Sequence, residues 1–539
     1  MSSFKGTGVS PGLAIGKPYF INNEVDFSIK PHKSLIESIK LLNERYDHLI
    51  EELKNTNRDL ESEIIDSYKL ILNDPEIKNE LEKINNDDIE AIYNVFTSSA
   101  NLLETLEDEY FKQRTEDIIS IGKELIFTMQ STPSDHNQGD NIIVIAKQLT
   151  PNDTSSLNLK KVLGFIVQEA GQTSHAVIVA KNLGIPCVIG IDIESVKKES
   201  ENLVAVDGLT GEVFLNPDEK IISEVEKYKM TNEKLKKDYT KKNIESIEIE
   251  FRANIGSDEE INQFSDDLIQ SVGLFRSEFI YIDKASKPSL EEQIKINEKL
   301  SSKFNNDIVF RTLDIGGDKE VSYLNLPKEE NPFLGVRGIR YSFKEKDLFR
   351  EQIISILKSS LISKVKIMFP MVSILEEYLD AKDIVSEEAK KLGLETPPLG
   401  IMVETPAAAI NARIFADYVD FFSIGTNDLI QYTYAADRGV AELNKYQDPL
   451  NPAVLNLINN VIQIGRELNV EVSVCGDMAS DQEGAIILYL LGLRIFSIAP
   501  SQAPLILSSL HKANTQLSHI SSDEILSQID SQSVRNLIV

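Results

Sequence analysis

The segment from Leu399 to Thr433 reads LGIMVETPAAAINARIFADYVDFFSIGTNDLIQYT. It contains two short apolar runs, LGIMVE and DFFSIG, with enough residues between them for a helix, so it predicts a strand, a helix and a second strand. Polar residues follow each run, because Glu404 closes the first run and Asn427 and Asp428 come just after the second. The same alternation continues on both sides of this segment.

Residues 250–539 contain eight such apolar runs, most of them separated by room for a helix. The runs are FRANIG (251–256), VGLFRS (272–277), DIVFRTLD (307–314), VKIMFP (365–370), LGIMVE (399–404), DFFSIG (420–425), EVSVC (471–475) and IFSIA (495–499). Eight alternating strand and helix units over about 250 residues are typical of a (β/α)8 TIM barrel. The sequence therefore predicts a TIM barrel for residues 250–539.

The N-terminal half has a different pattern of apolar residues. The opening GTGVSPGLAIGKPYF (6–20) is short, apolar and interrupted by Gly and Pro, which predicts a turn and a strand. Residues 35–130 carry apolar side chains at three- and four-residue spacing, which predicts long amphipathic helices in a bundle. From DNIIVIAKQLTP (140–151) onward, short β-branched runs predict an α/β domain that the N-terminal strand completes. The helical region would then be an insertion into that domain.

These patterns predict a multidomain α/β protein. Residues 1–24 and 141–220 form the α/β domain, residues 25–140 the helical insertion, residues 221–249 a charged helical linker and residues 250–539 the barrel. A length of 539 residues fits three or four domains at about 150 residues each.

Composition limits the class of protein. Lys and Arg number 56 and Asp and Glu 85, so the formal net charge is −29. That charge argues against sequence-independent binding of nucleic acid and favours basic partners. The two cysteines, Cys187 and Cys475, cannot form a disulfide framework and are typical of a reducing compartment. With no signal-peptide pattern and no run of about 18 apolar residues, the sequence predicts a cytoplasmic protein that binds no membrane.

Polar and reactive side chains gather at the ends of the predicted barrel strands, where TIM-barrel enzymes carry their active sites. The residues at or just beyond those ends are Arg276, Arg311, Glu404, Asn427, Asp428, Arg438 and Cys475. Arginines bind phosphate or carboxylate oxygens bidentately, and Mg²⁺ is commonly held by one or two carboxylates and substrate phosphate. A thiol with a suitable pKa can protonate carbon. The set favours a small phosphorylated acid and a divalent metal.

Each of these residues also has a structural interpretation. A single strand-end Arg or Glu is more often part of a surface ion pair, and Cys475 alone is more often a buried apolar filler. The shared position of the whole set on one rim favours function. The segments RTLDIGGDKE (311–320) and ENPFLGVRGIRYS (330–342) add Asp314, Lys319, Arg337 and Arg340. Their glycines permit close backbone approach or mark only a tight turn.

The stretch GQTSHAVIVA (171–180) contains His175. No second His or Cys lies three or four residues away, so the local sequence indicates no metal site. One interpretation is a packed imidazole with its hydrogen bonds satisfied. The other is a phosphoryl acceptor, because Gly171 predicts a turn before an apolar helix, near which phosphate binds well, and a neutral imidazole is a competent nucleophile near neutral pH. The predicted rim has no histidine, so an acceptor would come from another domain.

The chain resembles the enzyme I family of the bacterial phosphoenolpyruvate:sugar phosphotransferase system. The matching stretches run in the family's order from Gly8 to Asp481 and include TSHAVIVAKNLGIPCVIG, GLFRSEFIY, RTLDIGGDKE, IMVETPAA, VCGDMASD and the highly specific SIGTNDLIQYT. The resemblance implies that phosphoenolpyruvate binds the barrel with Mg²⁺ and passes its phosphoryl group to His175, and that pyruvate is released. A histidine of the small carrier protein HPr would then take the phosphoryl group, as the first step of sugar uptake.

The resemblance also implies individual roles. Glu404 and Asp428 would hold Mg²⁺, and Cys475 would protonate the methylene carbon of enolpyruvate. The residues that would bind phosphate and carboxylate are Arg276, Arg311, Asn427 and Arg438. The α/β domain would carry the phosphohistidine, the helical insertion would bind HPr, and a homodimer would form through the barrel. The charged linker would act as the hinge.

The chain departs from the family's pattern in three stretches. Ala170 and Gln172 stand where Gly and Arg are usual before TSH, Tyr68 stands where His is frequent, and Asp477 stands where Glu is common. A basic side chain beside the acceptor is therefore missing. Tyr68 would alter the affinity or specificity for the carrier.

Two other functions stay open. A pyruvate phosphate dikinase-like enzyme shares the histidine and barrel motifs but needs an additional ATP-grasp domain, for which the chain has no room, and the sequence has no P-loop pattern. A regulatory scaffold that only binds HPr-like carriers would not need the intact rim. The acidic stretches Asp59–Glu63 and Glu104–Asp108 would steer a basic carrier, or are merely solvated.

Overall fold

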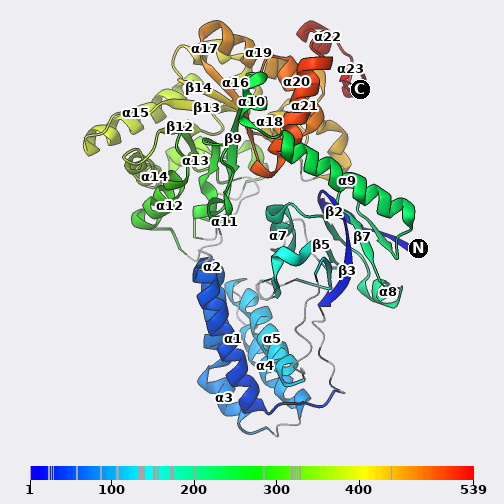
Figure 1. Cartoon of the computed structure of the whole chain (residues 1–539). Coiled ribbons are helices and arrows are strands. Elements are labelled where there is room, and N and C mark those ends of the chain that lie inside the picture. Colours follow the sequence, from blue (N-terminus) through cyan, green and yellow to red (C-terminus); the bar gives the residue numbers. More distant parts are fainter. Residues whose placement is uncertain are drawn as a thin grey trace. The chain divides into compact units, whose positions relative to one another are not determined.

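The computed structural model divides the chain into two compact units, residues 1–231 and 232–539 (Figure 1). The described residues are 2–538 except 22–24, 26, 28, 56–58, 85–87, 105–108, 131–139, 150–152, 155–156, 170–174, 200–201, 283–285, 317–320, 322, 325, 327–328 and 439. Side chains are described for these residues except 49, 52–64, 102–117, 175, 178, 181–182, 259, 263, 441–442 and 444. Within this part of the chain, no helix combines the length and the apolar character needed to cross a membrane.

An eight-stranded mixed sheet organises the first unit. Its strands along the chain are β1 (Ser2–Lys5), β2 (Thr7–Ser10), β3 (Leu13–Ile21), β4 (Ile142–Ala146), β5 (Val162–Val167), β6 (Cys187–Ile189), β7 (Val204–Asp207) and β8 (Glu212–Leu215). Their spatial order is β1-β8-β7-β3-β4-β5-β6-β2, with β3, β4, β5 and β6 parallel. The N-terminal strands therefore lie beside strands from more than a hundred residues later. The helices α7 (His175–Leu183) and α8 (Ile193–Glu199) also belong to this part.

The described residues between β3 and β4 form five helices, although these two strands are hydrogen-bonded neighbours. They are α1 (Leu35–Asn55), α2 (Asp59–Leu72), α3 (Pro75–Leu81), α4 (Ile89–Glu104) and α5 (Glu109–Gln130). These helices have a hydrophobic core of their own, in which Leu42, Tyr46 and Phe96 are fully buried. The predicted helical insertion into an α/β fold is thus confirmed.

Tyr68, where the family often has His, lies inside this helical core. It is 3% exposed and meets the ring of Tyr46 edge-on at 6.5 Å between centroids. The Tyr46 hydroxyl donates a 2.6 Å hydrogen bond to Glu124 Oε2. Burial raises the pKa of Glu124 to about 7. Because Tyr68 is buried, any effect that it has on a partner acts through packing and not through direct contact.

The second unit contains a closed barrel of eight parallel strands. They are β9 (Glu250–Ile255), β10 (Val272–Arg276), β11 (Ile308–Arg311), β12 (Val365–Phe369), β13 (Leu399–Val403), β14 (Phe421–Ile424), β15 (Glu471–Val474) and β16 (Ile495–Ile498). Each of the eight predicted apolar runs forms one of these strands, so the predicted TIM barrel is confirmed. The closure comes from the parallel pairing of β16 with β9.

Helices surround the barrel (Figure 1). They are α11 (Asp258–Gln263), α12 (Leu290–Lys303), α13 (Ile339–Lys344), α14 (Lys346–Ser359), α15 (Leu375–Leu392), α16 (Pro406–Ile410), α17 (Ala412–Ala416), α18 (Thr426–Tyr434), α19 (Pro452–Leu468), α20 (Gln482–Leu490), α21 (Ala503–Gln516), α22 (Ser522–Leu526) and α23 (Ser531–Ile538). The segment predicted as a linker forms α9 (Glu219–Asp238) and α10 (Lys241–Ser246), and the division between the units falls within α9.

Side-chain alternation explains why the strand-end residues share one site. A separate buried cluster contains Leu274, Val309, Met368, Met402, Phe421 and Cys475, one residue from each of six consecutive strand segments. Because successive side chains of a strand point to opposite faces, the residue two positions further on faces the same way. Arg276 follows Leu274, Arg311 follows Val309 and Glu404 follows Met402 by two residues. They therefore project from the same face of their strands, at the carboxyl ends.

The amino ends of the barrel strands hold a partly buried ion cluster. Arg252, which is 3% exposed, donates bidentately to Glu471 at 2.8 and 3.0 Å and also binds Glu250. Lys366 donates to Glu471 at 3.0 Å and lies 2.8 Å from Asp307. Although burial raises it, the pKa of Glu471 is lowered to about 2 by Arg252 and Lys366. The cluster joins β9, β12 and β15.

Glu471→Gln is expected to lower the free energy of unfolding of the barrel at pH 7 by about 2–3 kcal/mol. The folded pKa lies below the unfolded one, so the carboxylate stabilises the barrel above its unfolded pKa, and this contribution is lost as the pH falls through about 2. Urea unfolding of the full chain, read by pulse proteolysis of barrel fragments, measures both effects. Glu467→Gln, in the exposed pair with Arg413, is the control and should leave the midpoint unchanged. Equal midpoints for the two variants would contradict the prediction.

Candidate active site

Arg311 is a buried arginine at the end of β11 that is held by carboxylates. Its Nη2 donates to Glu278, and its Nη1 lies 3.4 Å from Asp314 and 3.5 Å from the Met402 sulfur. Although burial opposes it, Glu278 and Asp314 raise the pKa of Arg311 above its usual range, so the guanidinium stays charged. Its Nε is buried and has no hydrogen-bond partner within the described part of the chain. That donor is available to a ligand oxygen.

Arg276 closes β10 and is exposed at the mouth of the barrel. Its guanidinium lies against Gly256, which follows β9, because a Cβ at position 256 would come within 2.3 Å of Nη2. A side chain at that position would displace the guanidinium. Gly256 therefore leaves the space that Arg276 occupies.

Gln352 of α14 reaches the two strand ends that carry these arginines. Its Oε1 accepts the Leu313 N–H at 3.0 Å, and its Nε2 donates to Ser277 Oγ at 2.9 Å. Ser277 Oγ in turn donates to the Arg311 carbonyl at 2.8 Å. All of these groups are buried, so a helix side chain fixes the backbone next to Arg276, Arg311 and Asp314. Gln352 was not among the residues predicted from the sequence, because it lies on a helix and not at the end of an apolar strand run.

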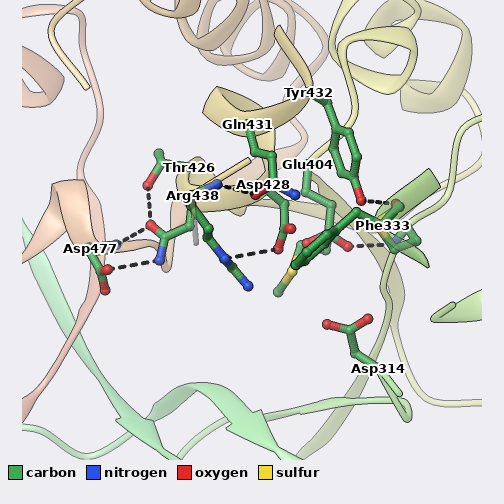
Figure 2. A network of polar contacts seen from close by, with 12 residues as sticks. Asp314, Phe333, Glu404, Thr426, Asp428, Gln431, Tyr432, Arg438 and Asp477 are labelled. Atoms are coloured by element: carbon green, nitrogen blue, oxygen red, sulfur yellow. Dashed lines mark hydrogen bonds and ion pairs between the residues drawn. The ribbon is translucent and has the colours of Figure 1, made fainter. Parts of the chain in front are cut away.

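Glu404 and Asp428, the predicted metal ligands, are both buried and lie together at the strand ends (Figure 2). Glu404 accepts the N–H of Met371, a residue in the left-handed region with φ of 60°. Burial raises the pKa of Glu404 to about 8, the charges of Asp428 and Asp314 add to this, and Arg311 and Arg337 oppose it. A divalent cation would offset that repulsion between carboxylates.

The described residues contain no group of three or more His, Cys, Asp or Glu side chains arranged to hold a metal. Mg²⁺ is commonly held by one or two carboxylates and completed by water and substrate oxygens, and Glu404 and Asp428 are two buried carboxylates at the strand ends. The residues fit the predicted metal on the chemistry of these two carboxylates.

Arg337 is a central residue of the site that was named in the sequence analysis without a role. It is 1% exposed and donates to Asp314 at 3.1 and 3.2 Å, to Asp428 at 3.1 Å and to the Tyr432 hydroxyl at 3.1 Å. Although burial opposes it, Asp314 and Asp428 raise the pKa of Arg337 above its usual range. It ties the loop after β11 to α18. The neighbouring Arg340 instead donates to two backbone carbonyls at 3.2 Å.

Arg438 and Asn427 complete the predicted set at α18. Arg438 Nη1 lies 3.8 Å from Asp428 Oδ2, and its backbone N–H donates to Gln431 Oε1 at 3.0 Å (Figure 2). The Asn427 amide forms two hydrogen bonds with Asp477, at 2.9 Å to its carboxylate and 3.0 Å from its N–H. The substitution of Asp for the usual Glu at position 477 therefore acts directly on Asn427.

Cys475 is buried at the end of β15, and its thiol lies 3.6 Å from the Ile424 carbonyl. Burial raises its pKa to about 11, although Arg311 opposes this. The thiol therefore stays protonated at neutral pH, which is the form that a proton donor needs.

Cys475 is expected to react with iodoacetamide far more slowly than an exposed cysteine at pH 8, because only about one thiol in a thousand is ionised three pH units below its pKa. Its alkylation rate should rise about tenfold for each pH unit between pH 7 and 9.5. Peptide mass spectrometry separates Cys475 from Cys187, and circular dichroism confirms that the fold is intact. A rate that levels off near pH 9 would contradict the raised pKa.

His175 is the first residue of α7, and its side chain lies outside the described part of the structure. Ala170 and Gln172 also lie outside the described residues. The helix buries Ala176, Val177 and Ala180 against the sheet core. In the barrel unit, His511 and His519 lie in and after α21, which follows the last barrel strand, and neither belongs to a barrel strand. The structure therefore brings together the predicted barrel residues but does not relate His175 to them.

Charge balance indicates what the site accepts. The strand ends carry four arginines, Arg276, Arg311, Arg337 and Arg438, and four buried carboxylates, Glu278, Asp314, Glu404 and Asp428. The sum is zero when all are ionised. A divalent cation together with a phosphorylated carboxylic acid would leave the site close to neutral, whereas either one alone would leave an uncompensated buried charge.

Comparisons with protein families define the class of protein. Residues 230–515 match the PEP-binding domain of PEP-utilising enzymes, residues 138–211 their mobile domain and residues 5–114 their N-terminal region. The fold and the matched segments thus define a PEP-utilising enzyme.

Similar proteins narrow this class. The chain is 36% identical over 561 residues to a phosphoenolpyruvate-protein phosphotransferase of Priestia megaterium, covering 98% of this chain and 95% of that one. It is 35% identical over 551 residues to that of Staphylococcus epidermidis, covering 97% and 95%. A solution structure of Enzyme I is 27% identical, over 42% of this chain and 99% of that chain, with a TM-score of 0.36. The chain belongs to the phosphoenolpyruvate-protein phosphotransferase family and is a transferase.

Proposed function

We propose that the protein transfers the phosphoryl group of phosphoenolpyruvate to its own His175 and then to a histidine of an HPr-type carrier, releasing pyruvate. The observation that carries this proposal is the set of arginines, buried carboxylates and a protonated thiol at one end of the barrel. This set can bind and neutralise a phosphorylated acid, and phosphoryl transfer depends mainly on such positioning and neutralisation.

The chemical step assigns each residue a task. Arg276, Arg311, Asn427 and Arg438 bind the phosphate and carboxylate oxygens. The bond between phosphorus and the enol oxygen breaks while a bond from phosphorus to the His175 imidazole forms. The enolate takes the proton of the Cys475 thiol at its methylene carbon and becomes pyruvate, and the thiolate regains a proton from water.

Glu404 and Asp428 would hold Mg²⁺. When bound, the ion would supply charge neutralisation at the phosphate oxygens. The raised pKa of Glu404 supports this assignment, because a carboxyl surrounded by other carboxylates gains from a cation.

The acceptor would reach the barrel from the other unit. His175 belongs to residues 1–231 and the proposed donor site to residues 232–539. Transfer therefore requires a hinge, for which the helical segment α9 and α10 is the candidate.

The carrier would dock on the helical insertion. The acidic stretches Asp59–Glu63 and Glu104–Asp108, predicted to attract a basic carrier, have side chains outside the described set. If they steer the carrier, raising the ionic strength slows carrier phosphorylation.

We also propose a cytoplasmic location, which is supported by the two buried free thiols. We further propose a homodimer through the barrel, which sedimentation of the full chain tests.

Incubation with phosphorus-labelled phosphoenolpyruvate and Mg²⁺, with and without HPr, tests the function. We expect acid-labile label on the peptide that contains His175, and its passage to HPr when the carrier is added. Omission of Mg²⁺ should prevent labelling. Absence of label would support the regulatory scaffold, and formation of phosphoenolpyruvate from pyruvate and ATP would support the dikinase-like enzyme.

A further inference from the structure

Asn254 on β9 connects three strand segments through its side-chain amide. Its Nδ2 donates to the backbone carbonyl of Cys475 at 3.2 Å and to that of Ser497 at 3.0 Å. Ser497 Oγ donates to Asn254 Oδ1 at 2.6 Å. β9 pairs with β16 but not with β15. The Asn254 side chain therefore extends past the adjacent strand β16 and contacts the backbone of Cys475, the proposed proton donor.

The orientation of this amide is determined by its partners. A flipped amide would place Oδ1 against two carbonyl oxygens, which cannot donate. Ser497, which is fully buried, has little freedom to move, because a Cβ at Gly273 would come within 2.2 Å of its Oγ. Both hydrogens of Nδ2 and one acceptor site of Oδ1 are in use, so the amide has one defined orientation.

The backbone of Cys475 is consequently held from two sides. Its N–H donates to the Ile424 carbonyl at 3.1 Å, and its carbonyl accepts from Asn254. The thiol has one side-chain torsion and contacts the same Ile424 carbonyl. With the backbone held on both sides, Cβ is fixed, and the sulfur can lie only on the arc that rotation about the Cα–Cβ bond allows.

We propose that Asn254 is a positioning residue that sets the direction from which Cys475 delivers its proton, so that enolpyruvate is protonated on one face only. This inference rests on the proposed function. In the step, the S–H bond of Cys475 breaks, the enolate electron pair forms the new C–H bond and the carbonyl of pyruvate forms. The thiolate is reprotonated by water. A planar enol can be protonated from either face, and a donor held on one side of the bound enol reaches one face only.

The test uses phosphoenolpyruvate with deuterium at one of its two vinyl positions, converted by the full-length enzyme with Mg²⁺ and HPr in tritiated water. One-sided protonation makes pyruvate with a chiral methyl group of a single configuration. We expect this for the unchanged protein. Asn254→Leu keeps the size of the side chain but removes both donors, and should make largely racemic methyl groups. Its single-turnover labelling should persist, while pyruvate formation falls by up to about 100-fold.

Three comparisons make the outcome decisive. Ser497→Ala leaves both Nδ2 contacts but removes the donor that orients the amide, so it should lose part of the chirality, and it decides the matter if Asn254→Leu does not fold. Asn456→Leu removes an exposed amide that donates to the Pro452 carbonyl within its own helix, and should retain full chirality. A single configuration from both Asn254→Leu and Ser497→Ala would overturn the inference. Racemic pyruvate or no labelling with the unchanged protein would instead contradict the proposed function.

Discussion

Replacement of His175 by alanine is expected to abolish phosphorylation of the chain by phosphoenolpyruvate. The barrel supplies arginines and carboxylates but, in its described part, no histidine at the strand ends, so the proposed acceptor cannot be replaced by a neighbour. Loss of the imidazole removes the atom that forms the bond to phosphorus. Rapid-quench labelling, followed by peptide mapping, should show at least about a 10⁴-fold loss.

Binding should survive this change, because His175 belongs to a different unit from the arginines. Calorimetric titration with phosphoenolpyruvate and Mg²⁺ is therefore expected to give an unchanged Kd for His175→Ala. His511→Ala and His519→Ala are matched controls in the barrel unit and should label at the normal rate. Full labelling of His175→Ala would show that another residue accepts the phosphoryl group.

Replacement of Arg337 by methionine is expected to slow phosphorylation of the chain by about 100-fold, the upper end of the range found when a group that orients metal-binding carboxylates is lost. The guanidinium separates Asp314 from Asp428 by donating to both. It also lowers the pKa of Glu404, which is about 8 with Arg337 present. Without it the pKa of Glu404 rises further, so Mg²⁺ competes less well with a proton.

Two readouts distinguish this effect from general damage. The concentration of Mg²⁺ needed for half-maximal labelling at pH 7 should rise for Arg337→Met, and increasing the pH should partly restore it, because ionised Glu404 is the form that binds metal. Arg340→Met is the control, since Arg340 contacts backbone carbonyls and lies 3.9 Å from Glu377, and its rate should change less than about threefold. Equal losses for the two variants would contradict a special role for Arg337.

The variant Arg337→Lys separates the effect of the charge at position 337 from the effect of the guanidinium geometry. A lysine carries the charge but cannot make the planar set of contacts to two carboxylates and a tyrosine. Its rate is expected to fall between those of the unchanged protein and Arg337→Met. A rate equal to that of the unchanged protein would mean that charge alone is sufficient.

The departures from the family's pattern have different structural meanings. Tyr68 is a core residue of the helical insertion, so the expected effect on the carrier is indirect. Asp477 is bonded to Asn427 through both its carboxylate and its N–H. Gln172 lies outside the described residues, and its expected effect on the phosphohistidine stays a prediction.

The sequence by itself determined the barrel and most of the proposed site. The eight apolar runs predicted the strands and also the residues at their ends, because in a parallel barrel the carboxyl end of each strand lies on the same rim. Arg276, Arg311, Glu404, Asp428 and Cys475 were found this way, since each lies at a fixed distance from an apolar run.

Only the tertiary structure decided the roles of Arg337, Gln352 and Asn254. The hydrogen-bond partners of their side chains lie 23 to 243 positions away along the chain, and a local sequence pattern carries no information on such contacts. Arg337 lies in a long loop, Gln352 lies on a helix, and Asn254 lies within a strand whose sequence pattern predicts only a structural role. Hydrogen bonds and buried charges depend on where atoms meet in space, and closure of the barrel brings these side chains to the backbone and carboxylates that they hold.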